Sequence, residues 1–218
     1  MNKTPIKITH VIIALTLIIV GVVGAVTPYS FNWLSTTFFG SASLLIIFGY
    51  RQFKSMMKPM ERPFFWRLAM LLLLSFLIKG GIVAVGEIFS LVDVNAFPTN
   101  PAVGAANNGG ILSNVIEVIK TSVSIVGEEL LVAGITLPSY FYVKNNKFGW
   151  VLSNLIGCLA FGIMHIVTYD FQLWPCLMVG LSRYPYSQAW QSTNSLRGGM
   201  YTHLISDLII LVPAMFIW

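Results

Sequence analysis

Residues 8–26 read ITHVIIALTLIIVGVVGAV, a run of nineteen residues without an acid or an amine. About 20 apolar residues are needed for a helix to cross the hydrocarbon core of a bilayer, so this run predicts a transmembrane helix. The rest of the chain has the same character. Hydrophobic residues make up 56% of its 218 residues and charged residues 10%, whereas a soluble domain averages roughly 25% charged residues. This composition excludes a soluble enzyme, a disordered chain and a disulfide scaffold, and it predicts an integral membrane protein.

Six further segments are predicted to be membrane spans. They cover residues 31–50, 68–92, 111–143, 150–169, 171–181 and 198–218. The sequence therefore predicts an all-α, polytopic transmembrane bundle of about seven spans, which forms a single membrane domain over residues 1–218. Its first part, residues 1–67, holds two spans and a basic loop.

Lysine and arginine predict the orientation of the bundle. With seven spans and a cytoplasmic N-terminus, eleven of the 13 basic residues fall on the cytoplasmic side, as the positive-inside rule expects. These eleven are Lys3, Lys7, Arg51, Lys54, Lys58, Arg62, Arg67, Lys144, Lys147, Arg183 and Arg197. The segment 93–110 contains neither residue type and is placed outside. We therefore predict a multi-pass protein of the cell membrane.

The net charge of +5 does not indicate nucleic-acid binding. The basic residues lie at the predicted membrane boundaries, where attraction to anionic lipid explains them. Membrane lipid is the predicted partner, and no nucleic acid is expected. The two cysteines, Cys158 and Cys176, form neither a disulfide framework nor a four-ligand metal site.

Several ionisable residues lie at membrane depth, where they are costly and usually face a protein interior or a water-filled cavity. Lys79 and Glu87 share nearly one face of the third span and are predicted to be structural, either paired through neighbours or reaching outward. Glu117 and Lys120 have the i, i+3 spacing of a local ion pair.

Glu128 and Glu129 are adjacent carboxylates in the middle of an apolar helix. The rotation of about 100° per helical residue turns them in different directions, so both cannot reach one small site equally. A buried carboxyl group is a candidate general acid or base. The alternative is a buried acid that a helix neighbour neutralises.

Two of the three histidines, His165 and His203, also lie inside predicted spans, whereas His10 lies at the start of the first span. His165 follows Phe161 by four residues, and Asp207 follows His203 by four, so each pair shares a helix face. Three chemistries fit these residues: activation of water with stabilisation of an oxyanion, coordination of zinc by imidazole and carboxylate, and a proton relay in a transporter. Spacing alone does not choose among them.

Three motifs together resemble a known family. EELLVAG (residues 128–134), FGIMH (161–165) and HLISD (203–207) occur in this order on successive predicted helices. They resemble the CPBP family of intramembrane proteases, the CAAX protease and bacteriocin-processing group that is also called the Abi family. The resemblance covers residues 111–211, which would form the CPBP-like catalytic core.

The resemblance implies an endopeptidase that cleaves a membrane-associated peptide, either a prenylated CAAX tail or a bacteriocin-like substrate. Glu128 would be the general base, with His165 helping to activate the water. His203 and Asp207 would form the oxyanion-stabilising or metal-facing pair, and Glu129 would orient the site. The resemblance leaves open whether the enzyme works without a cofactor or with a divalent metal such as zinc, which Glu128, His165 and His203 would hold.

Two residues depart from the family pattern. Ala133 stands where an arginine usually follows the second glutamate, so Glu129 is either protonated or paired with a residue that the sequence does not identify. Asp207 stands where asparagine is common, and an ionised aspartate cannot donate a hydrogen bond to an oxyanion. The first departure motivates an alternative, a non-catalytic bacteriocin self-immunity or interaction protein that keeps the protease fold. A proton-coupled transporter is a third hypothesis.

Two expectations concern the geometry of this core. The polar stretch 182–196 is predicted to be a connection that lines the substrate entrance. Glu128 lies further from the cytoplasmic end of its span than His203 does from the start of the last span. The fourth span is therefore expected to tilt or to end early near Pro138, because proline disfavours a helical residue before it.

Overall fold

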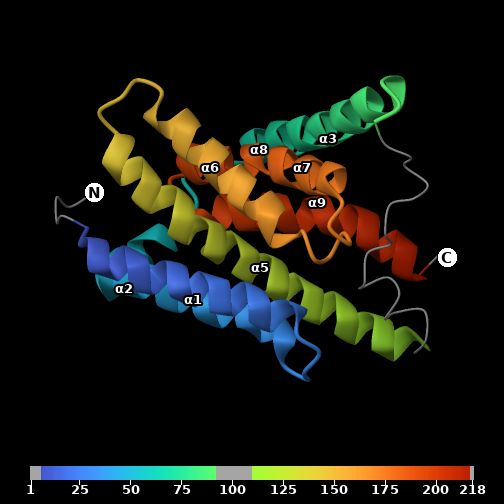
Figure 1. Cartoon of the computed structure of the whole chain (residues 1–218), viewed down its shortest axis with the longest axis horizontal. Coiled ribbons are helices and arrows are strands. Elements are labelled where there is room, and N and C mark those ends of the chain that lie inside the picture. The colour runs from blue at the N-terminus through green and yellow to red at the C-terminus, as the bar shows by residue number, and fades with distance from the viewer. Residues whose placement is uncertain (1–5, 92–109, 217–218) are drawn as a thin grey trace.

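The computed structural model describes residues 6–91 and 110–216, and these residues form helices and turns without a strand. Figure 1 shows the helices lying alongside one another in a bundle, which confirms the predicted all-α fold. The helices are α1 (Ile8–Val26), α2 (Ser35–Met56) with a short 3-10 turn before it (Asn32–Leu34), α3 (Phe65–Ile88), α5 (Gly110–Val143), α6 (Gly149–Met164), α7 (Leu173–Ser182), α8 (Tyr184–Thr193) and α9 (Leu196–Phe216).

Within residues 6–91 and 110–216, four helices are long and apolar enough to cross a membrane: α1, α2 with its preceding turn, α3 and α9. Many of their large apolar side chains point away from the bundle, as the 63% exposure of Ile19 illustrates. In a bilayer such side chains face lipid, so the chain is a membrane protein. α7 and α8 have ten residues each, and each is therefore only about 15 Å long, half the thickness of a hydrocarbon core. The predicted sixth span, residues 171–181, is thus the short helix α7, and the count of seven spans stays a prediction.

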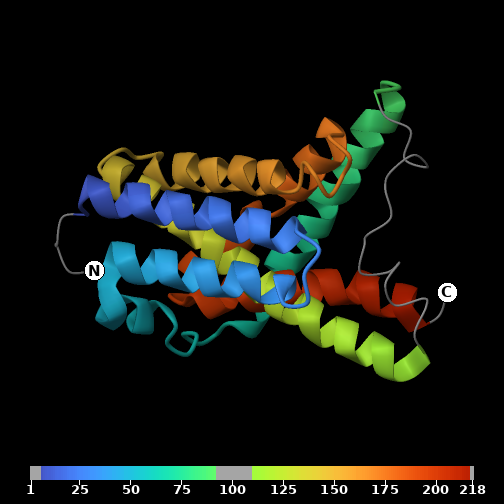
Figure 2. The same ribbon diagram turned by 60° about the horizontal axis from the view of Figure 1, so that its bottom comes forward.

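The ends of the helices sort into two groups. The start of α1, the end of α2 and the connection between α5 and α6 lie at one end of the bundle, and the end of α9 lies at the other (Figure 2). The connections at the first end carry many of the basic residues. This grouping agrees with a shared membrane side, while the orientation itself stays a prediction. The segment predicted to be outside, residues 93–110, lies almost entirely beyond the described residues.

α5 packs against α2, α6, α9 and α1, and its path is fixed just before the two glutamates. Thr36 and Thr37 of α2 donate hydrogen bonds to the carbonyl oxygens of Ser124 and Val123. Gly127 lies against the backbone of Thr37, where a Cβ atom would collide with the backbone nitrogen. This close approach sets the height and rotation of α5 at the position where Glu128 and Glu129 follow.

The expectation that α5 ends near Pro138 is wrong, because the helix continues to Val143. A proline inside a membrane helix is tolerated where neighbouring helices and serine or threonine side chains compensate for the freed backbone groups. Pro138 is buried among such neighbours, and Ser139 donates a hydrogen bond to the carbonyl oxygen of Ile135 in the same turn.

α3 covers α7, α8 and α9 from one side. The loop before α3 is joined to the turn between α8 and α9 by polar contacts that we call the loop clamp. In it Lys58 and Asn194 donate hydrogen bonds to Glu61 Oε1 at 2.9 and 2.6 Å, and the Glu61 backbone N–H donates to the carbonyl oxygen of Thr193. The clamp connects the N-terminal half of the chain to the helices that carry the candidate site.

Candidate active site

His203 of α9 is buried and is the point where three carboxylates meet. Its Nδ1 atom lies 3.1 Å from Glu129 Oε1, and its Nε2 atom lies 3.3 Å from Asp207 Oδ2 and 3.9 Å from Glu128 Oε2. The structure therefore brings four of the five predicted site residues into one cluster. An imidazole can donate at both nitrogens only in its protonated, imidazolium form.

The two adjacent glutamates reach opposite nitrogens of this ring. The side chain of Glu129 is fully buried, whereas 22% of the Glu128 side chain is exposed. The helical rotation that separates them thus places the Glu129 carboxylate behind His203, on the buried Nδ1 side of the ring. It places the Glu128 carboxylate in front of His203, on the partly exposed Nε2 side. As the sequence predicted, the two carboxylates do not share the site equally.

His165, the fifth predicted residue, approaches the cluster through Phe161. It lies directly after the last residue of α6, and its ring packs on the Phe161 ring with the centroids 4.5 Å apart. The Phe161 ring also meets the His203 ring edge-on at 5.5 Å. The Glu128 carboxylate interacts electrostatically with both histidines. His165 Nδ1 lies 2.9 Å from the carbonyl oxygen of Phe161. A carbonyl can only accept, so in the neutral ring Nδ1 carries the proton and Nε2 keeps its lone pair.

Glu129 has an arginine partner that comes from a different helix than the family pattern would predict. Arg183, between α7 and α8, donates a hydrogen bond from Nη2 to Glu129 Oε1 at 2.9 Å. Trp190 Nε1 donates to the other carboxylate oxygen at 2.9 Å. The guanidinium also lies over the rings of Phe161 and Trp190. Arg183 therefore takes the role of the arginine that is missing at position 133, and it is the residue that neutralises Glu129.

The prediction that Arg183 is a boundary residue explained by attraction to anionic lipid is wrong. Its side chain is fully buried against Glu129, because a carboxylate inside an apolar bundle is stabilised most by a charged, hydrogen-bonding partner. The positive-inside count treats every arginine as a boundary residue and cannot detect a partner from another helix.

The segment 182–196 was predicted to be a connection. The structure shows instead that it contains the buried helix α8. Tyr186 and Trp190 are 2% and 4% exposed, and Tyr186 stacks on His203 with the ring centroids 4.7 Å apart. Two signals in the sequence mark this helix: Pro185 in its first turn, and Asn194, which adopts a left-handed conformation (φ 50°) directly after it. Its polar residues suggested a loop, because the sequence does not show that their hydrogen-bond partners lie inside the protein.

Lys79 of α3 is a further residue of the cluster that sequence reasoning missed. Its ammonium lies 3.7 Å from Asp207 Oδ1 and donates a hydrogen bond to Ser206 Oγ at 3.1 Å. The predicted partner, Glu87, is exposed. Eight residues of helix separate Glu87 from Lys79 by about 12 Å, too far for direct contact. The other predicted structural pair, Glu117 and Lys120, is confirmed, with its atoms 2.6 Å apart.

The described residues contain no group of three histidine, cysteine, aspartate or glutamate side chains arranged to hold a metal ion. The predicted metal set of Glu128, His165 and His203 thus stays a prediction that the geometry of the described residues does not support.

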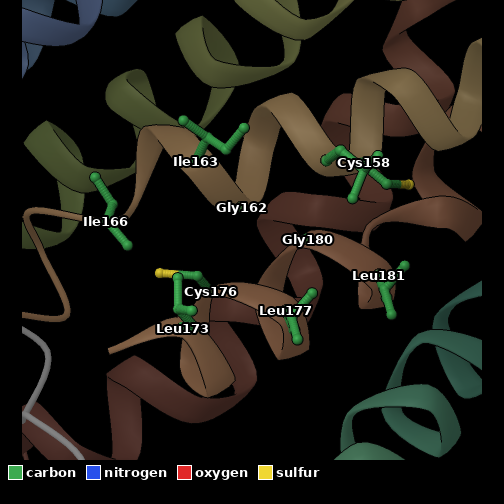
Figure 3. Close-up of a pocket in the computed structure, with 10 residues that line it drawn as sticks. Cys158, Gly162, Ile163, Ile166, Leu173, Cys176, Leu177, Gly180 and Leu181 are labelled. Carbon is green, nitrogen blue, oxygen red and sulfur yellow. The ribbon is translucent and has the colours of Figure 1, made fainter. Parts of the chain in front are cut away.

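An apolar cavity of about 190 Å³ lies between α6 and α7 (Figure 3). Cys158, Gly162, Ile163 and Ile166 line it from α6 and the turn that follows, and Leu173, Cys176, Leu177, Gly180 and Leu181 line it from α7. Ile163 and Leu173 are about 70% exposed, so the cavity opens on the outer surface of the bundle. Ile163 and Ile166 flank His165 in the sequence, so the cavity adjoins the segment that carries this histidine.

Comparison with known proteins identifies the family. Residues 111–209 match the family model described as type II CAAX prenyl endopeptidase Rce1-like. That model represents the CPBP family, so residues 111–209 carry a domain of the family that the three motifs resemble. The match includes all five predicted site residues and Arg183, whereas Lys79 lies outside it. No curated protein and no solved structure matches the chain.

Proposed function

We propose that this protein is an intramembrane endopeptidase of the cell membrane that hydrolyses a peptide bond in a membrane-associated peptide or protein. One observation carries the proposal. Glu128 is a partly exposed carboxylate in front of His203, while Glu129 behind the same ring is fully buried and held by Arg183 and Trp190. Of the two adjacent glutamates, Glu128 is therefore the one that water and a substrate can reach.

The reaction is a hydrolysis in two steps. Glu128 accepts a proton from a water molecule while the water oxygen forms a bond to the scissile carbonyl carbon, and the carbonyl electron pair moves to its oxygen. The tetrahedral intermediate then collapses, the carbon–nitrogen bond breaks, and the leaving nitrogen takes the proton from Glu128. His165 helps to orient the water through its Nε2 atom, because its Nδ1 atom faces the carbonyl oxygen of Phe161. Glu129 orients His203 from behind, and Asp207 faces the opposite ring nitrogen.

The substrate class follows from the family and from the cavity between α6 and α7. An apolar, outward-opening cavity next to the His165 segment suits an aliphatic or prenyl group that enters from the lipid. We therefore infer a peptide with a CAAX-like or bacteriocin-related sequence that is bound to the membrane. We further infer a single membrane domain with its N-terminus in the cytoplasm, as the positive-inside rule expects.

Peptide cleavage by the detergent-purified protein tests the proposal. The probes are two quenched-fluorescence peptides, one with a farnesylated CAAX tail and one with a bacteriocin leader sequence. Glu128→Gln should lower kcat by about 10²–10⁴-fold, the usual contribution of a general base. Glu117→Gln is the matched control, because it alters a glutamate of the same helix away from the cluster, and it should leave kcat unchanged.

Cleavage that survives Glu128→Gln, His165→Ala and His203→Ala would remove the enzymatic proposal. The immunity alternative rested on the missing arginine at position 133, a gap that Arg183 fills. Protection of cells from a bacteriocin that persists in the Glu128→Gln variant would nevertheless favour that binding role.

A further inference from the structure

Lys79 brings a positive charge into the cluster from α3, outside the residues that match the family model. The inference drawn from it rests on the proposed hydrolysis. An ammonium in a membrane helix is costly and is usually retained for a partner or for a function. The Lys79 side chain is 18% exposed, and its chain of contacts leads through Asp207 to His203 Nε2.

The position of Lys79 is fixed by its surroundings. One turn before it in α3, the buried Ser75 donates a hydrogen bond to the carbonyl oxygen of Ser182, and its Oγ atom also lies 3.1 Å from the Tyr186 hydroxyl oxygen. Tyr186 in turn donates to Ser206 Oγ, the same atom that accepts from Lys79. These contacts hold α3 against α8 and α9 and keep the ammonium beside Asp207.

The oxyanion of a tetrahedral intermediate needs hydrogen-bond donors, and the cluster has few to offer. Ionised Glu128 and Asp207 only accept, and both ring nitrogens of His203 face carboxylates. His165 has its Nδ1 proton directed at the Phe161 carbonyl. Lys79 carries three N–H donors. In the described part of the chain, one of them donates to Ser206 Oγ, while Asp207 Oδ1 at 3.7 Å is an ion-pair partner beyond hydrogen-bond distance and the Phe76 ring centroid lies 5.6 Å from the ammonium.

We propose that Lys79 is the oxyanion-stabilising residue of the site. Its ammonium donates a hydrogen bond to the carbonyl oxygen that becomes negatively charged when the water adds, and Asp207 holds the ammonium in place. The lysine–aspartate pair thereby supplies the donor that an asparagine would supply at position 207. No bond to Lys79 forms or breaks, and its charge is the same before and after the reaction.

Kinetics with the farnesylated peptide test this role. Lys79→Met should lower kcat by about 10²–10³-fold, as loss of one oxyanion donor usually does, and should change KM by less than about threefold. Lys79→Arg should retain more activity because it keeps a cationic donor. Lys120→Met is the matched control, since it removes a paired lysine away from the cluster. Thermal unfolding in detergent shows whether each variant is folded.

A second background separates an oxyanion donor from a residue that only neutralises Asp207. In Asp207→Ala there is no carboxylate to neutralise, so a purely neutralising Lys79 could be removed at no further cost. We expect the double variant Asp207→Ala with Lys79→Met to have a kcat at least tenfold lower than that of Asp207→Ala alone. Equal kcat with and without Lys79 in the Asp207→Ala protein would overturn the proposal.

Binding of a transition-state mimic gives a readout that does not depend on turnover. A farnesylated peptide phosphinate carries anionic oxygens in tetrahedral geometry, and its dissociation constant can be measured by calorimetry. Lys79→Met should weaken its binding about 100-fold, and Lys120→Met should not. Unchanged binding in Lys79→Met would refute the role of Lys79. Full activity in Glu128→Gln would instead refute the proposed base and leave the result for Lys79 intact.

Discussion

The two sides of the His203 ring differ in almost every physical respect. On the Nδ1 side, Glu129 is fully buried and receives hydrogen bonds of 2.9 Å from Arg183 and Trp190. On the Nε2 side, Glu128 and Asp207 are partly exposed, and their contacts are longer. The ring nitrogen lies 3.9 Å from Glu128 and 3.3 Å from Asp207, and Lys79 lies 3.7 Å from Asp207. One side is closed and saturated with hydrogen bonds, and the other is open.

This difference teaches how one histidine can serve both structure and chemistry. A buried carboxylate with satisfied oxygens fixes the ring but has no capacity left for a substrate. A carboxylate that is partly exposed and has longer contacts keeps that capacity. The closed side is therefore expected to determine stability, and the open side activity, although Glu128 and Glu129 are neighbours in the chain.

The largest expected effect on stability comes from breaking the closed side. Arg183→Met leaves Glu129 buried without its charged partner, which typically costs about 3–5 kcal/mol. The free energy of unfolding, measured with denaturant in detergent micelles, should fall by that amount. Lys120→Met removes an ion pair that is partly exposed, and it should cost less than about 1 kcal/mol.

The double variant Arg183→Met with Glu129→Gln sharpens this test. It removes both charges and keeps an amide oxygen that can accept from Trp190 while the amide NH2 faces His203 Nδ1, so most of the lost stability should return. If the double variant were as unstable as Arg183→Met alone, the buried charge would not be the cause of the loss.

A smaller effect is expected from a methyl group placed on the closed side. Gly199 of α9 lies against Trp190, and a Cβ atom there would also come within 2.6 Å of Glu129 Oε2. Gly199→Ala should therefore destabilise the protein by about 1–3 kcal/mol, as overpacking does. A Cβ atom at Gly80 of α3 would meet no heavy atom within 4 Å. Gly80→Ala should therefore show no such loss in the same unfolding measurement. Equal stability of the two variants would contradict the close packing described for the closed side.

The smallest effect concerns the loop clamp, which lies outside the membrane-spanning helices. The hydrogen bond from Lys58, followed by that from Asn194, holds the pKa of Glu61 below its ordinary value. A pKa that is lower in the folded protein stabilises the fold above the unfolded pKa, and this contribution is lost as the pH falls through the folded pKa. The difference in Tm between the parent and Glu61→Gln should thus be small and positive at pH 7 and vanish near pH 3. A difference that persists at pH 3 would assign it to a contact other than the charged carboxylate.

The long apolar elements and the motif residues could be predicted from the sequence. α1 was expected at the bounds that it has, because a run of apolar residues uninterrupted by charge has one stable arrangement in lipid. The i, i+4 spacing likewise placed His203 and Asp207 together, since one helix turn fixes their separation.

The residues that complete the site could not be predicted in the same way. Arg183, Trp190 and Lys79 reach the cluster from helices whose mutual packing is not encoded in any local spacing. Arg183 was assigned to a membrane boundary, and the polar helix α8 to a connection, because both assignments assumed that polar residues seek water. Here their partners are other polar side chains inside the bundle.

The order of residues along the chain was enough to establish a helical membrane protein, its family motifs and the carboxylates and histidines of its core, because apolar length and helical periodicity act over short distances. Only the packing of helices decided that Glu129 meets Arg183 and that Asp207 meets Lys79. Such contacts depend on how distant segments are placed in three dimensions, and the strength of an interaction between charges depends on the distance and the burial that this placement creates.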